Sequence, residues 1–266
     1  DNEALRNLMS LDVRTGQVTK LIGNARIGDL VVNPADDSLW GLRSANGRHT
    51  IVRLAPPYTK WSSVRSFPFG EVLYDLDISP DGKLLSTSFG EMNGDQSVRV
   101  MRIDSLLNDD SKAAPKVVSK FNFGTAVPES FVFSADGKYL YGSSYYTGVS
   151  NIYRYEVATG EIHAMSNSET GFFRPLSLAD GSLLVLRYTG DGFVPSTIQP
   201  KVLEDLSAVT FLGAEVAEKY PAVKKWQVAA PGSVDLESLV VSEGKYNSVK
   251  NIRLESVYPV VEGYKD

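Results

Sequence analysis

The sequence predicts an all-β protein with a β-propeller fold, built from four-stranded antiparallel blades. The first observation is an internal repeat, in which two apolar runs flank an Asp-Gly turn, as in residues 76–85. This pattern predicts two antiparallel strands joined by a tight hairpin. The second observation is the spacing of the turn aspartates, at intervals of 45, 55 and 44 residues, which is typical of propeller blades. The aspartates that mark the four copies are Asp36, Asp81, Asp136 and Asp180.

A second repeated phrase supports the same period. Gly16 and Gly160 each follow a threonine between two apolar runs, and they lie 144 residues apart, which is three periods of 48. We interpret these Thr-Gly pairs as turns between the last two strands of a blade. The Asp-Gly pairs join the first two strands, because aspartate before glycine favours the positive φ of such a turn. The paired turn residues are Asp81 and Gly82, Asp136 and Gly137, and Asp180 and Gly181.

The elements in chain order are a half-blade followed by four blades. Residues 7–22 have the pattern of only the last two strands of a blade. The four recognisable blades span about residues 29–67, 74–121, 130–166 and 174–212. Because an unpaired strand edge invites aggregation, we expect the half-blade to pair with further strands, either from the C-terminal part of the chain or from another chain.

The C-terminal tail, residues 213–266, has a different pattern from the blades. Residues 214–220 predict a short helix that ends before Pro221. Two extended runs follow at 236–241 and 249–257, and they either complete the half-blade or lead into a further domain. The chain begins at Asp1 and not at methionine, from which we expect an excised domain or a processed product.

The composition excludes several classes of function. The chain has 266 residues, 42% of them hydrophobic, which is enough for a sizeable core. The net charge is −5 and the basic residues are scattered, so the sequence gives no basic face for a nucleic acid. The absence of cysteine removes disulfides and thiol chemistry. No apolar run is long enough to cross a bilayer, although attachment to a membrane-embedded domain of a longer protein stays open.

The sequence also lacks the usual catalytic motifs. It has no Gly-x-Ser-x-Gly elbow and no phosphate-binding glycine loop, and its two histidines, His49 and His163, fall in a hairpin and an outer strand. The acidic loops at 108–110 and 190–192 could attract calcium, but they lack the alternating ligands of an EF-hand loop. We therefore expect solvated loops there, and calcium binding stays open. We therefore expect no catalytic residue, no cofactor and no metal site.

Candidate binding residues lie in the loops between the second and third strands of consecutive blades. A pair of loop tyrosines follows the strand 139–144, and exposed tyrosines often anchor a protein partner. The alternative is that these rings fold back onto their own blade. The candidate residues are Tyr145, Tyr146, Glu91, Met92, Arg187 and Tyr188.

The segments 79–83, 134–140 and 152–161 resemble the repeats of the TolB-like, WD40-like (PD40-type) β-propeller superfamily. The resemblance covers residues 7–212, and it departs from true WD40 repeats, since the Gly-His and Trp-Asp pairs are absent. It implies the propeller fold. The superfamily includes the periplasmic propeller of the Tol system, the propellers that gate prolyl oligopeptidase-type hydrolases, and repeats in bacterial envelope proteins.

Together these observations predict a non-catalytic propeller that acts as a protein-interaction or scaffold domain of a larger bacterial cell-envelope protein, with a protein or peptide partner and a periplasmic location. The alternative is the regulatory propeller of a prolyl oligopeptidase-type serine peptidase whose hydrolase domain lies outside this sequence. A third possibility is a propeller enzyme of the lactonase or glycosidase kind, which needs a metal or paired carboxylates at the channel mouth.

Overall fold

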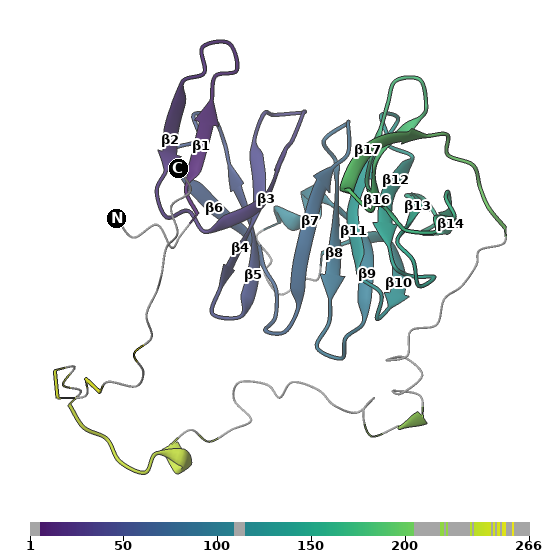
Figure 1. Ribbon diagram of the computed structural model, residues 1–266. Helices are drawn as coiled ribbons and strands as arrows, with labels where there is room; N and C mark the ends of the chain where they lie inside the picture. Colours follow the sequence, from purple (N-terminus) through teal and green to yellow (C-terminus); the bar gives the residue numbers. More distant parts are fainter. Residues whose placement is uncertain are drawn as a thin grey trace, which may run out of the picture. The chain divides into compact units, whose positions relative to one another are not determined.

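The computed structural model describes residues 6–108 and 115–204, together with short stretches between 219 and 257. The chain divides into two compact units, residues 1–228 and 229–266. The first unit is built from antiparallel sheets whose strands follow one another along the chain (Figure 1). The predicted all-β fold of propeller blades is confirmed.

Each sheet is a meander in which neighbouring strands are consecutive in sequence. The chain starts with a two-stranded hairpin of β1 (Leu8–Leu11) and β2 (Val18–Ile22). The first blade contains β3 (Ile27–Val32), β4 (Leu39–Ala45), β5 (Arg48–Leu54) and β6 (Trp61–Ser66). The second blade contains β7 (Val72–Ile78), β8 (Leu84–Gly90), β9 (Gln96–Arg102) and β10 (Val117–Gly124). The third blade contains β11 (Pro128–Phe133), β12 (Tyr139–Ser144), β13 (Asn151–Glu156) and β14 (Ile162–Ala164). The fourth blade contains β15 (Phe172–Ser177), β16 (Leu183–Thr189) and β17 (Gly192–Ile198).

The blades stack in chain order through their faces. The first strands of successive blades contact each other, β3 with β7, β7 with β11, and β11 with β15. Because side chains alternate between the two faces of a strand, a blade with two neighbours can bury apolar residues against both of them. One core joins the first and second blades around Trp40, Leu85 and Phe89. Another joins the second and third blades around Val100, Leu140 and Tyr155, so the main cores lie between the sheets.

The two ends of the stack have smaller cores of the same kind. Ile152 and Met165 of the third blade pack with Leu183 and Val185 of the fourth. At the other end, Leu8 of the β1–β2 hairpin belongs to a cluster with residues of the first blade. Within the described residues, β1 and β2 pair only with each other, so a strand partner for the hairpin stays a prediction.

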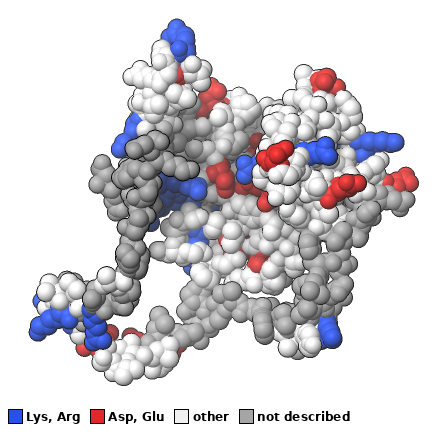
Figure 2. Space-filling view, in the orientation of Figure 1, with Lys and Arg blue, Asp and Glu red and all other residues white. Residues whose placement is uncertain are grey.

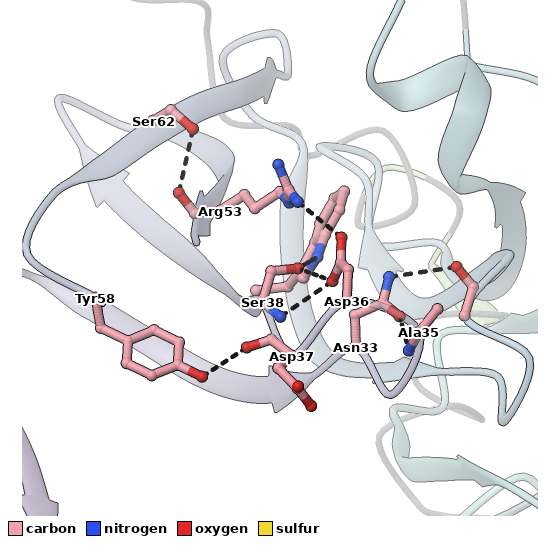
Figure 3. A network of polar contacts seen from close by, with 10 residues as sticks. Asn33, Ala35, Asp36, Asp37, Ser38, Arg53, Tyr58 and Ser62 are labelled. Carbon is pink, nitrogen blue, oxygen red and sulfur yellow. Dashed lines mark hydrogen bonds and ion pairs between the residues drawn. The ribbon is translucent and has the colours of Figure 1, made fainter. Parts of the chain in front are cut away.

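The turn of the first blade ties its strands to a buried tryptophan (Figure 3). Trp40 Nε1 donates a hydrogen bond to Ser38 Oγ at 2.9 Å, and the Ser38 hydroxyl donates to Asp36 Oδ1 at 2.5 Å. The other carboxylate oxygen of Asp36 accepts from Arg53 Nη2 at 2.7 Å. Asp37 stands where the other blades have glycine, and it takes the left-handed φ of 55° itself. The turn therefore keeps its geometry without glycine.

The Asp-Gly turns of the other blades repeat one hydrogen-bonding scheme. Ser79 Oγ donates to Asp81 Oδ1 at 2.6 Å, and Ser134 Oγ donates to Asp136 Oδ1 at 2.7 Å. In the fourth blade, Asp180 accepts from the hydroxyl of Ser182 at 2.6 Å. These serine hydroxyls lower the pKa of each of the three carboxyl groups. The repeated aspartates thus serve the turns in which they lie.

The second blade contains a short helix after its third strand. Strand β9 ends at Arg102, and the short helix α1 (Ile103–Leu106) follows. Ile103 and Leu106 are buried against the core, which favours a helical turn over a further strand residue. The end of the predicted fourth blade, residues 205–212, lies outside the described residues.

The predicted tail elements fall in both units. Most of the predicted helix at 214–220 lies outside the described residues. The predicted strand at 236–241 is wrong, because the short 3-10 helix η2 (Glu237–Leu239) occupies its centre. Asp235 caps this turn, since its carboxylate accepts from the backbone N–H of Glu237 at 3.2 Å. The described residues of the run 249–257 begin with a turn at 249–250 and form no strand.

Candidate functional site

The loops that carry the predicted binding residues all lie at one end of the blades, which we call the loop end. Each loop lies between two strand residues that pair with each other. Residues 91–95 lie between Gly90 and Gln96, residues 145–150 between Ser144 and Asn151, and residues 190–191 between Thr189 and Gly192. The Asp-Gly turns join the first and second strands, so they lie at the opposite end. The structure therefore brings consecutive blades' loops to a common end.

Four aromatic rings form a continuous, partly exposed surface at the loop end, which we call the aromatic surface. Tyr145 packs edge-on against Phe173, with ring centroids 5.9 Å apart. Phe173 packs in the same way against Phe193 at 5.2 Å, and Phe193 lies 5.4 Å from Tyr188. The exposed fractions of Tyr145, Tyr188 and Phe193 are 44%, 49% and 57%. Two predicted residues, Tyr145 and Tyr188, are thus linked by two phenylalanines that the sequence analysis did not select.

Tyr146 points to a different group of rings. It packs edge-on against Phe121, Phe123 and Tyr153 at centroid distances of 5.8, 5.5 and 6.2 Å. The hydroxyl of Tyr153 also shares a hydrogen bond of 3.0 Å with Thr147 Oγ1. Tyr146 therefore fits the alternative that the sequence analysis left open, in which a loop ring folds back onto the blades.

Glu91 and Met92 are held by neighbours within the second blade and beside it. Glu91 Oε1 lies 2.5 Å from Arg99 Nη2 and 3.4 Å from Lys120 Nζ. Arg99 also stacks 4.0 Å over the Phe89 ring. A Cβ added to Gly70 would lie 2.2 Å from Met92 Cγ, so the methionine packs directly on that glycine. Arg187 is exposed in β16, opposite Phe172 and Val194.

The sequence analysis missed a recurring bulge in the first strand of each blade. The register of β3, β7, β11 and β15 shifts at one place each, and one residue there has a left-handed φ between 48° and 53°. Left-handed non-glycine residues are uncommon and concentrate at functional sites. The four residues are Asp29, Asp75, Ser130 and Arg174. Their signal is positional, since three of them stand six residues before a turn aspartate.

Three of the four bulge residues line a small cavity between the first strands. The cavity has a volume of about 170 Å³, and its lining includes Asp29, Asp75 and Ser130. Asp75 Oδ2 accepts from the backbone N–H of Ser130 at 2.7 Å, and Asp77 Oδ2 accepts from that of Phe133 at 2.6 Å. Two carboxylates of the second blade thus hold the first strand of the third. Figure 2 shows acidic side chains near the middle of the face, with basic ones beside them.

Burial raises the pKa of both Asp75 and Asp77, against the opposing effect of the backbone hydrogen bonds that they accept. The charge of Asp29 raises the pKa of Asp75 further, and Arg174 lowers it. A raised folded-state pKa means that the folded protein holds a proton that the unfolded chain has already lost. Each of these groups therefore destabilises the fold as the pH rises from the ordinary aspartate range through the raised pKa.

We expect Asp77→Asn to reduce the loss of stability that accompanies rising pH above the ordinary aspartate range. The wild type should lose stability relative to the variant as the pH rises above the ordinary aspartate pKa of about 4, because only the wild type deprotonates the carboxyl group at position 77. Urea unfolding of both proteins across this range measures the difference in the free energy of unfolding. Two parallel profiles would show that Asp77 titrates as it does in the unfolded chain.

The described residues also bear on metal binding, membrane-spanning helices and the two histidines. The described part of the chain contains no group of three or more residues with metal-ligand side chains. No helix in it is long and apolar enough to cross a membrane. His163 lies in β14 opposite Arg154, whereas His49 Nδ1 accepts a hydrogen bond from the backbone N–H of Leu73 at 3.3 Å.

Comparison with known proteins rests on structure alone, since no protein-family model and no curated protein matches the sequence. TolB from Acinetobacter baumannii matches 75% of this chain and 50% of its own, with a TM-score of 0.55 and 17% identity. An oligogalacturonate lyase in complex with manganese matches 74% of this chain and 54% of its own, with a TM-score of 0.53 and 16% identity.

A puromycin hydrolase S511A mutant matches 72% of this chain and 33% of its own, with a TM-score of 0.50 and 16% identity. The chain thus spans about half the length of TolB and of the lyase, and about a third of the hydrolase. These identities are low, and the matched proteins differ in their activities, so the likeness concerns the fold. Together with the stacked antiparallel blades, it shows that residues 6–204 have the TolB-like β-propeller fold.

Proposed function

We propose that this chain is a non-catalytic propeller that acts as a protein-interaction or scaffold domain of a larger protein of the bacterial cell envelope. The observation that carries the proposal is the aromatic surface of Tyr145, Phe173, Tyr188 and Phe193 at the loop end. Its rings are held in place by each other, so a partner that binds them orders few side chains. Aromatic residues of this kind often provide most of the binding energy in protein interfaces.

The periplasmic or envelope location is part of the same proposal, and it is supported by the likeness of the fold to TolB and by the resemblance of the repeats. The loops of several blades contribute to one end, so specificity can arise from many contacts without a catalytic group. Tyr146 and Glu91 are not part of the aromatic surface, since the contacts of Tyr146 are with Phe123 and its neighbours and those of Glu91 are with Arg99 and Lys120.

The proposal predicts that polar substitutions in the aromatic surface weaken partner binding. The full-length protein is used to capture partners from an envelope extract, and the affinity for the principal partner is then measured. We expect Phe193→Ser and Tyr188→Ser each to weaken binding by about thirtyfold, the effect of losing an aromatic hot spot. Val13→Ser is the control, because Val13 is 91% exposed in the β1–β2 turn, away from the loop end. Equal binding by all of these variants would refute the proposed surface.

The regulatory propeller of a serine peptidase is the second candidate. It is favoured by the match to a puromycin hydrolase and by the same repeats. In that case the full-length protein would carry a serine nucleophile in another domain, and a fluorophosphonate probe would label it covalently. The scaffold proposal expects no labelling by this probe.

A further inference from the structure

A second cavity lies beside the bulge of the first blade, and nothing above assigns a role to it. Its volume is about 420 Å³, within the range of pockets that hold small ligands. The first strands of two blades contribute to it, since Gly28 lies in β3 and Leu73 in β7. The lining residues are Arg6, Arg26, Gly28, Asp29, Leu42, Ser44, His49 and Leu73.

Two arginines give the cavity a positive character. Arg6 and Arg26 both line it, and among the residues that the structure describes neither guanidinium forms an ion pair within 4.0 Å. The Arg6 side chain crosses directly over Gly28, because a Cβ added there would lie 2.8 Å from Arg6 Nη1. Asp29 supplies one carboxylate, so the formal charge of the lining with a neutral histidine is positive.

One further donor, the Ser44 hydroxyl, points to an anionic ligand. His49 Nδ1 accepts the hydrogen bond from the backbone of Leu73, which places the ring hydrogen on Nε2. Nε2 lies 3.3 Å from Ser44 Oγ, so the imidazole donates to the hydroxyl. The Ser44 hydroxyl then has its own hydrogen to donate to a ligand. The cavity thus offers two guanidinium groups and a hydroxyl as donors.

The remaining lining residues restrict the kind of anion. Leu42 and Leu73 are 4% and 1% exposed, so they add a fixed apolar wall. Asp29 is an acceptor beside the donors and would repel a highly charged anion, whereas it can accept from an amide N–H. A ligand that satisfies all of these groups has one carboxylate, an apolar side chain and a neighbouring amide.

We infer that the cavity binds the C-terminal carboxylate of a peptide whose last residue is apolar. Arg6 and Arg26 hold the carboxylate, Ser44 donates to it, the apolar side chain lies against Leu42 and Leu73, and Asp29 accepts from the last peptide N–H. The inference deepens the proposed function, on which it rests for the statement that the ligand belongs to a protein partner.

The test is a titration of the whole chain with the tripeptide acetyl-Gly-Gly-Leu, followed by NMR. We expect saturable binding, weakened at least about tenfold when the peptide carries a C-terminal amide, because hydrogen bonds between charged groups are strong. Arg6→Ala and Arg26→Ala should each cause a loss of similar size. Arg48→Ala is the matched control, since Arg48 is an exposed arginine beside His49 that does not line the cavity.

Three results would overturn the inference. They are equal binding of the acid and the amide, unchanged binding by both arginine variants, and binding of inorganic phosphate without binding of the tripeptide. The substitution Phe193→Ser should leave the tripeptide affinity unchanged, because Phe193 does not line the cavity. Failure of the aromatic surface as a docking site is therefore distinguishable from failure of the carboxylate site.

Discussion

Replacing Trp40 by alanine is expected to lower the free energy of unfolding by about 3–5 kcal/mol, the usual cost of removing a buried tryptophan from a core. Trp40 is fully buried and belongs to the core between the first and second blades. Its side chain also donates to Ser38, which is the inner end of the network that includes Asp36 and Arg53. The variant therefore leaves a large cavity and releases the turn that shapes the first hairpin.

Urea unfolding followed by far-UV circular dichroism measures this loss, and two variants interpret it. Trp61→Ala should cost only about 1–2 kcal/mol, because Trp61 is half-buried and stacks with Arg43 at 4.5 Å. Trp40→Phe keeps most of the apolar volume but loses the hydrogen bond. If Trp40→Phe were as destabilising as Trp40→Ala, the hydrogen bond and not the packing would be the main contribution of this residue.

The second large effect is expected for Gly82→Ala. Gly82 and Gly137 occupy equivalent turns and have the same φ of 70°. A Cβ at Gly82 would lie 2.4 Å from both the Ala35 Cβ and Asn33 Oδ1 in the turn of the first blade. At Gly137 the nearest atom is Pro80 Cδ at 3.5 Å. Gly137→Ala should thus cost about 1–2 kcal/mol from backbone strain alone. Gly82→Ala should cost about 2–5 kcal/mol, because overpacking adds to the same strain.

A double-mutant cycle separates the two causes. Ala35→Gly removes one of the two atoms against which the new Cβ would clash and leaves Asn33 Oδ1 in place, and Ala35 itself is exposed. If the clash is real, the double variant Gly82→Ala with Ala35→Gly should be more stable than the sum of the two single changes predicts. Urea unfolding of the four proteins gives the coupling energy. Strict additivity would show that the Ala35 Cβ does not contribute to the cost of Gly82→Ala.

The strands and their turns could be predicted from the sequence because their signals are local. The alternation of apolar residues and the Asp-Gly pairs specify hairpins within about ten residues of chain. The run at 236–241 is the instructive failure, since a short apolar segment does not distinguish a strand from the 3-10 helix found at Glu237–Leu239. Burial of Ile103 and Leu106 likewise depends on the neighbouring core and not on the local pattern.

The candidate sites could be predicted only in part. Loop tyrosines are visible in the sequence, but the contact of Tyr145 with Phe173 joins two different blades and depends on how these stack. The bulge residues share a backbone conformation and no side-chain chemistry, so the sequence marks them only by their distance from the turn aspartates. The cavity with Arg6 and Arg26 arises because the segment before β3 lies next to β7, which is a matter of tertiary structure.

The cores between successive blades have an energetic consequence. Each of the four apolar clusters joins one blade only to its immediate neighbour. The stability of the described blades is therefore approximately a chain of nearest-neighbour couplings, as in linear repeat proteins. The first, second and third blades are coupled on both faces, whereas the hairpin and the fourth blade are each coupled on one face within the described residues. Among the described blades, local opening is therefore expected to begin at the two ends of the stack, with the inner blades the last to unfold.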